Sequence, residues 1–330
     1  MEIKGILVSL LAPMENHIAN GGEKLLGNAS SIKRRPDERV YISGQMQRHA
    51  FFSALERLNL EDPYKGNTYV SNGDGISNAI EVDLRADLGG FMHPSAGNYS
   101  GRRTSPLSVT PAVALKESSI GRDLLIRLKL KVNEDDKSNE QALATGMGKT
   151  PKTARHNDKS NEQALATREF SQFDMMLMNF HLDITSLSIS KKFSYANKFH
   201  VKTEFVKHVK EDERKRRVKL FLEATRSLTD YAQQARNATS GEPQKVLIVF
   251  DNRLSRKACR YFEAGENERK NILNELNERG AKVIIGDDIE GEKSVSVAYK
   301  EALAFLESAT LYDPCGGDNN IETFAEAFKL

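Results

Sequence analysis

The chain has 330 residues, and its 48 Lys and Arg nearly balance its 46 Asp and Glu, which gives a formal net charge of +2. No apolar run approaches the ~18 residues that cross a membrane, so the sequence excludes an integral membrane protein. The spacing of its two cysteines, Cys259 and Cys315, excludes a disulfide scaffold and a zinc ribbon and favours a reducing cytoplasm. The N-terminus lacks a basic leader and is interpreted as a strand, not a signal peptide.

A strand followed by a helix is predicted for the first 60 residues. Residues 2–11 are β-rich, and Ser43 is a good N-cap for a helix that begins GQMQRHAFFSALERL. Gln45, Arg48 and His49 lie on one side of this helix, which is expected to present a polar, basic face near its N-terminus. The opposite, apolar face is expected to pack on a sheet. Its members are Met46, Ala50, Phe51, Ala54, Leu55 and Leu58.

The middle of the chain combines an insertion with a long hairpin. Residues 61–123 are rich in Gly, Asn, Ser and Pro, which predicts hairpins and loops. Residues 124–132 alternate apolar and basic side chains as a half-buried strand does, and residues 175–184 form a second strand. Between them the decapeptide DKSNEQALAT occurs at 136–145 and again at 158–167. One repeat is too few for a solenoid, so we interpret it as a tandem duplication that lengthens an exposed hairpin.

The C-terminal half alternates helices with buried strands. The stretch that begins KTEFVKHVKEDERKRR contains a helix whose apolar stripe extends from Val218 to Ala235. Its ERKRR run is interpreted as a solvated face in preference to a binding patch. Residues 245–251 form a buried strand, and a helix, a further strand and another helix follow. The complete order predicts an α+β, ferredoxin-like βαββαβ fold, with a doubly wound α/β sheet as the alternative for the C-terminal part.

The sequence contains no motif with the residue types and spacing of a catalytic site. The GMGKT sequence at 146–150 is not a phosphate-binding loop, because Leu143 occupies the position of the first glycine. The seven histidines lack the spacing of metal ligands. Asp83 and Asp87 are better explained as turn caps than as paired carboxylates. The sequence therefore predicts no catalytic residue, no metal site and no cofactor.

Basic residues near turns indicate phosphate binding instead. Lys33, Arg34 and Arg35 precede the first helix, whose N-terminal N–H groups favour an anion, and Arg102 and Arg103 follow glycines in the insertion. The long hairpin mixes cations with flat or soft apolar groups, a mixture that suits stacking on the splayed bases of a single strand. The members of this mixture are Met147, Lys149, Lys152, Arg155, Arg168, Phe170 and Phe173.

Four segments together resemble the DevR-type backbone subunit of type I CRISPR (Cascade) surveillance complexes. In chain order they are RVYISGQMQRHAFFSAL, EVDLRADLGGFM, GRRTSPLSVTPAVAL and ALATREFSQFDMMLMNFHLDI. The resemblance implies a palm with a modified RNA-recognition fold, from which a finger-like insertion and a β-hairpin thumb project. It also implies that many copies polymerise along a CRISPR RNA, and that the thumb folds over the guide and displaces one nucleotide at regular intervals.

By this resemblance the chain divides into five parts. Residues 1–60 are the first half of the palm, 61–123 the finger-like insertion, 124–132 a palm strand, 133–173 the thumb hairpin with the duplication, and 174–330 the second half of the palm with a C-terminal segment. The first expected contacts with guide RNA are Ser43, Gln45, Arg48 and His49. The other expected contacts are Lys33, Arg34, Arg35, Arg102 and Arg103, and in the thumb Met147, Lys149, Lys152, Arg168 and Phe170.

The resemblance further implies a non-catalytic scaffold. Related subunits of type III complexes cut RNA with an aspartate in the loop after the first strand, whereas loop 13–35 carries Glu15 and Glu23 but no Asp. The expected partners are a CRISPR guide RNA, target DNA through the guide, other copies of the chain and other Cascade subunits, in the cytoplasm and without a membrane. Two alternatives stay open. One is an endoribonuclease that processes CRISPR RNA, which substitution of His17 and His49 would test, and the other is a standalone regulator that binds duplex DNA.

Overall fold

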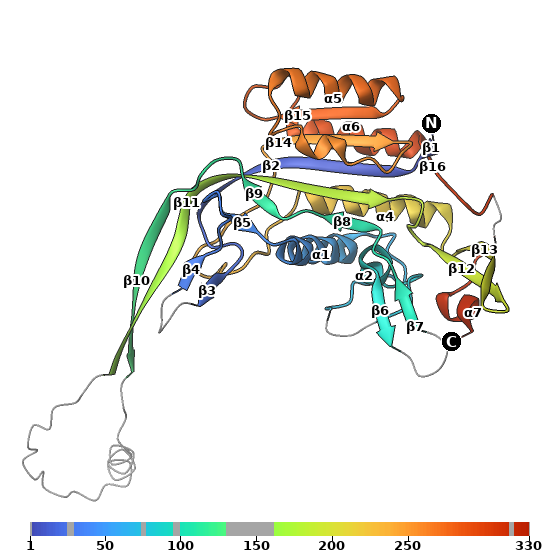
Figure 1. The fold of residues 1–330 in the computed structure, drawn as a ribbon, viewed down its shortest axis with the longest axis horizontal. Helices are drawn as coiled ribbons and strands as arrows, with labels where there is room; N and C mark the ends of the chain where they lie inside the picture. The colour runs from blue at the N-terminus through green and yellow to red at the C-terminus, as the bar shows by residue number, and fades with distance from the viewer. Residues whose placement is uncertain are drawn as a thin grey trace, which may run out of the picture.

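A sheet built from strands of both halves of the chain forms the centre of the structure (Figure 1). The computed structural model describes residues 2–24, 30–73, 77–94, 100–129, 162–316 and 320–329. The spatial order of the central strands is β15, β14, β2, β11 and then β8 with β9, and each neighbouring pair is antiparallel. Their bounds are β2 (Gly5–His17), β8 (Leu107–Val109), β9 (Ala112–Ala114), β11 (Glu162–Asp183), β14 (Lys245–Asp251) and β15 (Lys282–Asp287).

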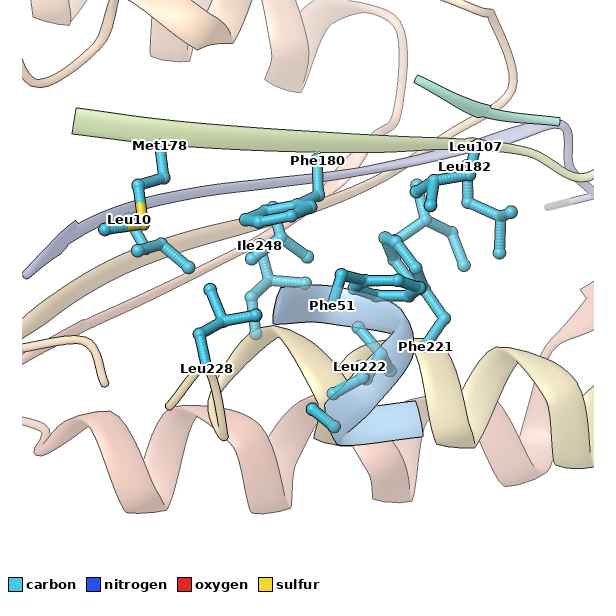
Figure 2. Close-up of a cluster of buried hydrophobic side chains, with 14 of the residues drawn as sticks. Leu10, Phe51, Leu107, Met178, Phe180, Leu182, Phe221, Leu222, Leu228 and Ile248 are labelled. Atoms are coloured by element: carbon cyan, nitrogen blue, oxygen red, sulfur yellow. The ribbon is translucent and has the colours of Figure 1, made fainter. Parts of the chain in front are cut away.

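Three helices cover one face of the sheet and bury the main hydrophobic core. Figure 2 shows Phe51 and Phe221 pointing from two of these helices toward Phe180 of β11. The ring centroid of Phe51 lies 5.8 Å from that of Phe180 and 5.8 Å from that of Phe221, so these rings join both helices to the sheet. The three helices are α1 (Gly44–Glu61), α4 (Glu211–Thr225) and α6 (Val295–Ser308).

A smaller core fills the opposite face of the sheet. Successive side chains of a strand point to opposite faces, so Leu7, Leu177 and Leu247 point away from the main core. They pack in one cluster with Phe262 and Ile272. The covering elements are the 3-10 helix η1 (Lys257–Arg260) and α5 (Glu266–Glu278). This part of the sheet is therefore a buried layer between helices.

Two elements predicted from local patterns are confirmed. Helix α1 begins directly after Ser43, whose side-chain oxygen accepts a hydrogen bond from the N–H of Met46 at 3.2 Å. Strand β14 has the predicted bounds 245–251 and is buried along nearly its whole length. Both elements depend on residues close together in the sequence, either a cap with its helix or one continuous apolar run.

Two predictions for the C-terminal half are wrong. Helix α4 ends at Thr225 and does not continue to Ala235. Leu228 packs in the main core from the loop that follows the helix. Its helical spacing from Val218 and Phe221 therefore reflected burial in the same core and not a continuing helix. Strands β14 and β15 pair antiparallel, which excludes the doubly wound parallel sheet that was the alternative for this part of the chain.

A long two-stranded hairpin projects from the body of the molecule (Figure 1). β10 (Ile120–Lys129) pairs antiparallel with the first part of β11, and Ser171 of β11 pairs with both Ile120 and His17. Beyond Ser171, β11 continues into the central sheet. The structure thus places residues 124–129 in the hairpin, while β8 and β9 occupy the position beside β11 in the sheet. An alternating apolar and basic pattern predicts a strand but does not say whether that strand lies in the sheet or in the ribbon.

Smaller elements gather at the other end of the molecule (Figure 1). Two hairpins lie there, β6 (Phe91–Pro94) with β7 (Ser100–Arg103) and β12 (Ile189–Ala196) with β13 (Phe199–Lys207), together with α2 (Leu84–Gly89) and α7 (Phe324–Phe328). The remaining strands are β1 (Glu2–Ile3), β3 (Gly22–Lys24), β4 (Ser30–Ile32), β5 (Tyr41–Ile42) and β16 (Thr310–Leu311). Within the described ranges, no helix has both the length and the apolar character that a membrane crossing requires.

Candidate nucleic-acid interface

Cations gather at the base of the long hairpin, where β4 pairs with β11 at Arg168. The carboxylate of Glu169 lies 3.1 Å from Arg122 Nη2 and 3.8 Å from Arg34 Nη2. Arg168 donates a hydrogen bond to Gln233 Oε1 at 2.9 Å. The side chain of Arg122 is 76% exposed. Glu169 itself is buried, but two arginines share it, so Arg122 can turn toward a phosphate while Arg34 stays beside the carboxylate. The exposed hydrogen bond of Arg168 to Gln233 can likewise be exchanged for one to a phosphate.

Lys33 and Arg35 flank Arg34, which forms an antiparallel bridge with Val40 before α1 begins. Arg34 also donates a hydrogen bond to Glu38 at 2.7 Å, and Arg35 Nε lies 3.8 Å from Asp37. Lys33 is half-buried and forms no ion pair with any residue that the structure describes. The three predicted cations therefore lie next to the hairpin base, with Arg34 and Arg35 in exposed, exchangeable pairs.

Phe170 packs inside the hairpin base. It pairs with Gly121 across the two strands, and its ring occupies the space that a side chain at position 121 would need. A ring laid over a glycine in this way supplies the packing that the glycine lacks and helps to hold the register of the strands. Phe170 is half-buried in this position. It therefore stabilises the strand pairing that presents Arg122 and Arg168.

The N-terminus of α1 carries three of the predicted contacts. Ser43 has its side-chain oxygen engaged as the helix cap, and its backbone N–H donates to Asn20 Oδ1 at 3.0 Å. Gln45 is exposed. His49 is also exposed, and its Nε2 lies 3.2 Å from Asp230 Oδ2. Of this predicted face, Gln45 and His49 are therefore at the surface, while Ser43 has a structural role in the helix.

Arg48 points into the protein and not to solvent. Its guanidinium group donates to the backbone oxygens of Gly89 at 3.0 Å and Leu107 at 3.3 Å, and to Ser105 Oγ at 3.1 Å. Burial, together with the charge of Arg85, lowers the pKa of Arg48. Arg48 thus connects α1 to the end of α2 and to the start of β8. This network gives Arg48 a structural role in the body of the protein.

The two arginines of the insertion lie in different surroundings. Arg102 is exposed, whereas the side chain of Arg103 is only 6% exposed and lies 2.6 Å from Asp87. The buried Arg217 donates to the same carboxylate at 2.7 Å. Burial alone raises the pKa of Asp87, but the guanidinium groups of Arg217 and Arg103 hold it below its ordinary value. Asp83 caps α2 as predicted, whereas Asp87 is the centre of a buried ion network and not a turn cap.

The ERKRR run is structural, so its interpretation as a solvated face is wrong. Arg214 and Arg217 are both 0% exposed. Arg214 donates to the backbone oxygens of Ile184 at 2.9 Å and Tyr312 at 3.0 Å, and Arg217 donates to that of Ile80 at 2.7 Å. These acceptors come from distant segments of the chain. The sequence of the helix alone does not reveal them.

The remaining thumb contacts, Met147, Lys149 and Lys152, lie outside the described residues. Sequence reasoning missed Arg122 and the strands β12 and β13, whose sequence KKFSYANKFHVKTEFVK alternates aromatic, polar and basic residues. That period of two was the signal for a ribbon with an aromatic face. In the part of the chain that the structure describes, no group of three His, Cys, Asp or Glu is arranged to hold a metal ion.

The chain is similar to known CRISPR-associated proteins. Residues 16–250 match the family model described as CRISPR-associated negative auto-regulator DevR/Csa2. A chain of a CRISPR RNA-guided surveillance complex has a similar fold, with a TM-score of 0.51 and 14% sequence identity over 91% of this chain and 98% of that chain. A chain of a second such complex, described as pre-nicking, has a TM-score of 0.47 and 12% identity over 92% and 99% of the two chains. No curated protein matches the sequence.

Proposed function

Because the chain belongs to the DevR/Csa2 family of CRISPR-associated proteins, we propose that it is a non-catalytic backbone subunit that binds a CRISPR guide RNA. In this proposal copies of the chain assemble along the guide within a Cascade-type complex. Exposed cations hold the phosphates, which carry most of the affinity and no sequence information. The projecting hairpin separates short stretches of bases, and these stay free to pair with target DNA.

The order of the elements supports an RNA-recognition palm. Along the chain the order is β2, α1, β8 with β9, β11, α4 and β14, and across the sheet it is β14, β2, β11 and β8 with β9. Both orders match a ferredoxin-like βαββαβ unit. In this interpretation β15 is an added edge strand, α2 and the β6–β7 hairpin belong to the finger-like insertion, and the β10–β11 hairpin is the thumb.

The observation that carries the proposal is the projecting β10–β11 hairpin with exposed cations at its base. A two-stranded ribbon is at most marginally stable in water by itself, so a long one is expected to gain stability from a partner surface. Arg34, Arg122 and Arg168 lie where this ribbon leaves the sheet. An RNA strand that follows these cations reaches the ribbon. The RNA is then the partner whose surface covers the ribbon.

The burial of His17 supports the non-catalytic role over the endoribonuclease alternative. A general acid or base must come within hydrogen-bond reach of the reacting group of its substrate. His17 is fully buried, and its Nε2 lies 2.7 Å from Asp174 Oδ2. His49 is exposed, and its Nε2 lies 3.2 Å from Asp230 Oδ2, so burial excludes only His17 as a general acid or base.

Co-expression with a CRISPR array tests the proposal. The purified complex is expected to hold guide RNA, with a high ratio of absorbance at 260 to 280 nm and a light-scattering mass of several copies. The double variant Arg122→Glu with Arg168→Glu should lose the RNA, because both reversals repel phosphate. The control Lys270→Glu with Lys300→Glu makes the same charge change at exposed positions of α5 and α6 and should retain it.

Other outcomes distinguish the alternatives. Retention of RNA by the Arg122 and Arg168 variant would overturn the assignment of the hairpin base. Shortening of a precursor CRISPR RNA by the purified chain would identify an endoribonuclease. A chain free of RNA that binds duplex DNA as a small oligomer would identify a standalone regulator.

A further inference from the structure

A cavity of about 550 Å³ opens between the β6–β7 hairpin and the β12–β13 hairpin. These hairpins lie at the end of the molecule away from the long hairpin (Figure 1). Arg102 and Arg103 line the cavity from β7, Lys191 and Phe193 line it from β12, and Phe324 lines it from α7. Ligand sites occupy about 300–1,000 Å³, so the cavity has room for a ligand of nucleotide size.

Hydrogen bonds and ring contacts hold the walls of this cavity together. Arg103 Nη1 donates to the backbone oxygen of Ile189 at 2.9 Å and to Ser190 Oγ at 3.2 Å, which joins β7 to the start of β12. On the third side, the ring of Phe324 in α7 lies 5.3 Å from that of Phe91 in β6, edge to face. The cavity is therefore preformed by packed, buried groups, and a ligand need not order its walls.

Cations outnumber carboxylates in the lining. Arg102 and Lys191 are exposed, and neither forms an ion pair with the residues that the structure describes. Asp183 also lines the cavity, but Oδ1 accepts from the hydroxyl of Thr185 at 2.6 Å and Oδ2 from that of Ser186 at 2.9 Å. With both oxygens of this carboxylate already engaged, the two exposed cations are the groups that favour an anionic ligand.

An aromatic surface continues outward from the cavity along β12 and β13. The side chain of Phe193 is 52% exposed, and its ring lies 5.8 Å from that of His200, which lies 6.0 Å from that of Tyr195. Phe205 is exposed and pairs with Lys191, two residues before Phe193 and hence on the same face of the ribbon. Rings interleaved with cations are the surface on which single-stranded nucleic acids stack, because every base has a flat apolar face.

We propose that this cavity binds one nucleotide of a single-stranded nucleic acid, with the phosphate held by Arg102 and Lys191 and the base stacked on Phe193. The inference rests on the proposed function, since the strand that the chain binds supplies the nucleotide. RNA and DNA share the phosphate and the base, so both chemistries fit the cavity. Beyond Phe193, the exposed ring of Tyr195 offers a surface to the adjacent base.

Ultraviolet crosslinking of the full chain to a single-stranded oligonucleotide tests the proposal, with mass spectrometry to identify the crosslinked residue. RNA and DNA of the same sequence are compared, and a crosslink at Phe193 is expected with at least one of them. The double variant Lys191→Ala with Phe193→Ala should lower the affinity about tenfold. The control Phe199→Ala with Lys202→Ala removes the same two side-chain types from exposed positions of the same hairpin that do not line the cavity.

The outcomes distinguish failure of this inference from failure of the proposed function. Equal losses in the two double variants would assign binding to the ribbon as a whole and overturn the cavity site. Unchanged affinity of the Lys191 and Phe193 variant, without a crosslink at Phe193, would overturn the inference while guide retention by the wild-type chain upholds the proposed function. A chain that binds neither oligonucleotide nor guide overturns both. Since Lys191 and Phe193 are exposed, melting temperatures near the wild-type value are expected for both double variants.

Discussion

The base of the long hairpin and the opposite end of the molecule both carry arginines, but in contrasting surroundings. At the hairpin base Arg122 is largely exposed and shares Glu169 with a second guanidinium group. At the other end Arg103 and Arg217 are buried and share Asp87. Moving a charge out of water costs several kcal/mol unless the charge forms an ion pair. The buried arginines therefore stay paired with Asp87. Arg122 can leave Glu169 for a phosphate at lower cost, because Arg34 still faces that carboxylate.

This contrast separates stability from binding. The buried network joins α2, β7 and α4 and should control whether that end of the molecule folds. The exposed arginines should control what the chain binds. Substitutions in the buried network are therefore expected to lower stability, and substitutions at the hairpin base are expected to lower RNA affinity.

The largest effect is expected from Asp87→Ala. It leaves Arg103 and Arg217 buried without their shared carboxylate, so the free energy of unfolding should fall by about 3–5 kcal/mol, as when one partner of a buried pair is removed. Urea unfolding followed by circular dichroism measures the change. The control Asp230→Ala removes an exposed carboxylate beside His49 and should alter stability by no more than about 0.5 kcal/mol. A loss below about 1 kcal/mol for Asp87→Ala would contradict the central role of the network.

The reverse result is expected from Arg122→Glu with Arg168→Glu. Arg168→Glu should change the free energy of unfolding by about 0.5 kcal/mol or less. Arg122→Glu also places a carboxylate opposite Glu169 and should cost about 1 kcal/mol. Loss of two charge-assisted contacts should lower RNA affinity about a hundredfold. The slope of log affinity against log salt should become shallower by about 1.4, or about 0.7 for each phosphate contact with a single strand. Titrations of labelled RNA at several salt concentrations give both values, and an unchanged slope would show that these arginines do not contact phosphate.

Mild acid should destabilise the folded state through two buried histidines, His208 near α7 and His181 in β11. Burial lowers the pKa of His208 to about 4 and that of His181 to about 4, whereas an unfolded histidine has a pKa near 6.5. The unfolded state therefore binds more protons, so stability is complete above about pH 6.5 and is lost as pH falls toward 4. The loss should reach about 1.4 kcal/mol per pH unit for each histidine.

Urea unfolding at pH 7, 6 and 5 measures this dependence. His208→Gln removes one titrating group, so the free energy of unfolding should fall less steeply with pH, by about 1.4 kcal/mol per pH unit. His208 Nδ1 lies 2.7 Å from the backbone oxygen of Glu322, near α7, so the acid effect should appear at that end of the molecule. An identical decline in the variant would show that other groups cause the acid sensitivity.

The smallest effect is expected at Ser43. Ser43→Ala removes the cap of α1 and should cost about 1 kcal/mol of stability, whereas Ser43→Asp keeps a capping oxygen. If the guide passes the start of α1, the added negative charge of Ser43→Asp should weaken RNA binding while stability stays near the wild-type value. Melting temperature and RNA titration together resolve the two roles. Equal RNA affinity for Ser43→Asp and the wild type would exclude this end of α1 from the interface.

Local patterns in the sequence determined the elements that depend on near neighbours. Ser43 and the apolar spacing that follows it correspond to α1, and the continuous apolar run at 245–251 corresponds to β14. Caps and periodic faces are set within a few residues, so a single segment contains the information. The resemblance to the DevR family also rested on short segments in order, and the family match covers residues 16–250. The contacts expected at Met147, Lys149 and Lys152 stay predictions.

Only the tertiary structure decided which charges are buried. Asp87 and Arg217 are 130 residues apart in the sequence, and Arg103 bonds to Ile189 over 86 residues. Nothing beside Arg103 in the sequence distinguishes it from the exposed Arg122. The same holds for residues 124–129, whose alternating pattern suits either a sheet or a ribbon. The physical reason is that the cost of burying a charge depends on whether a distant partner meets it, and only the folded chain brings the two together.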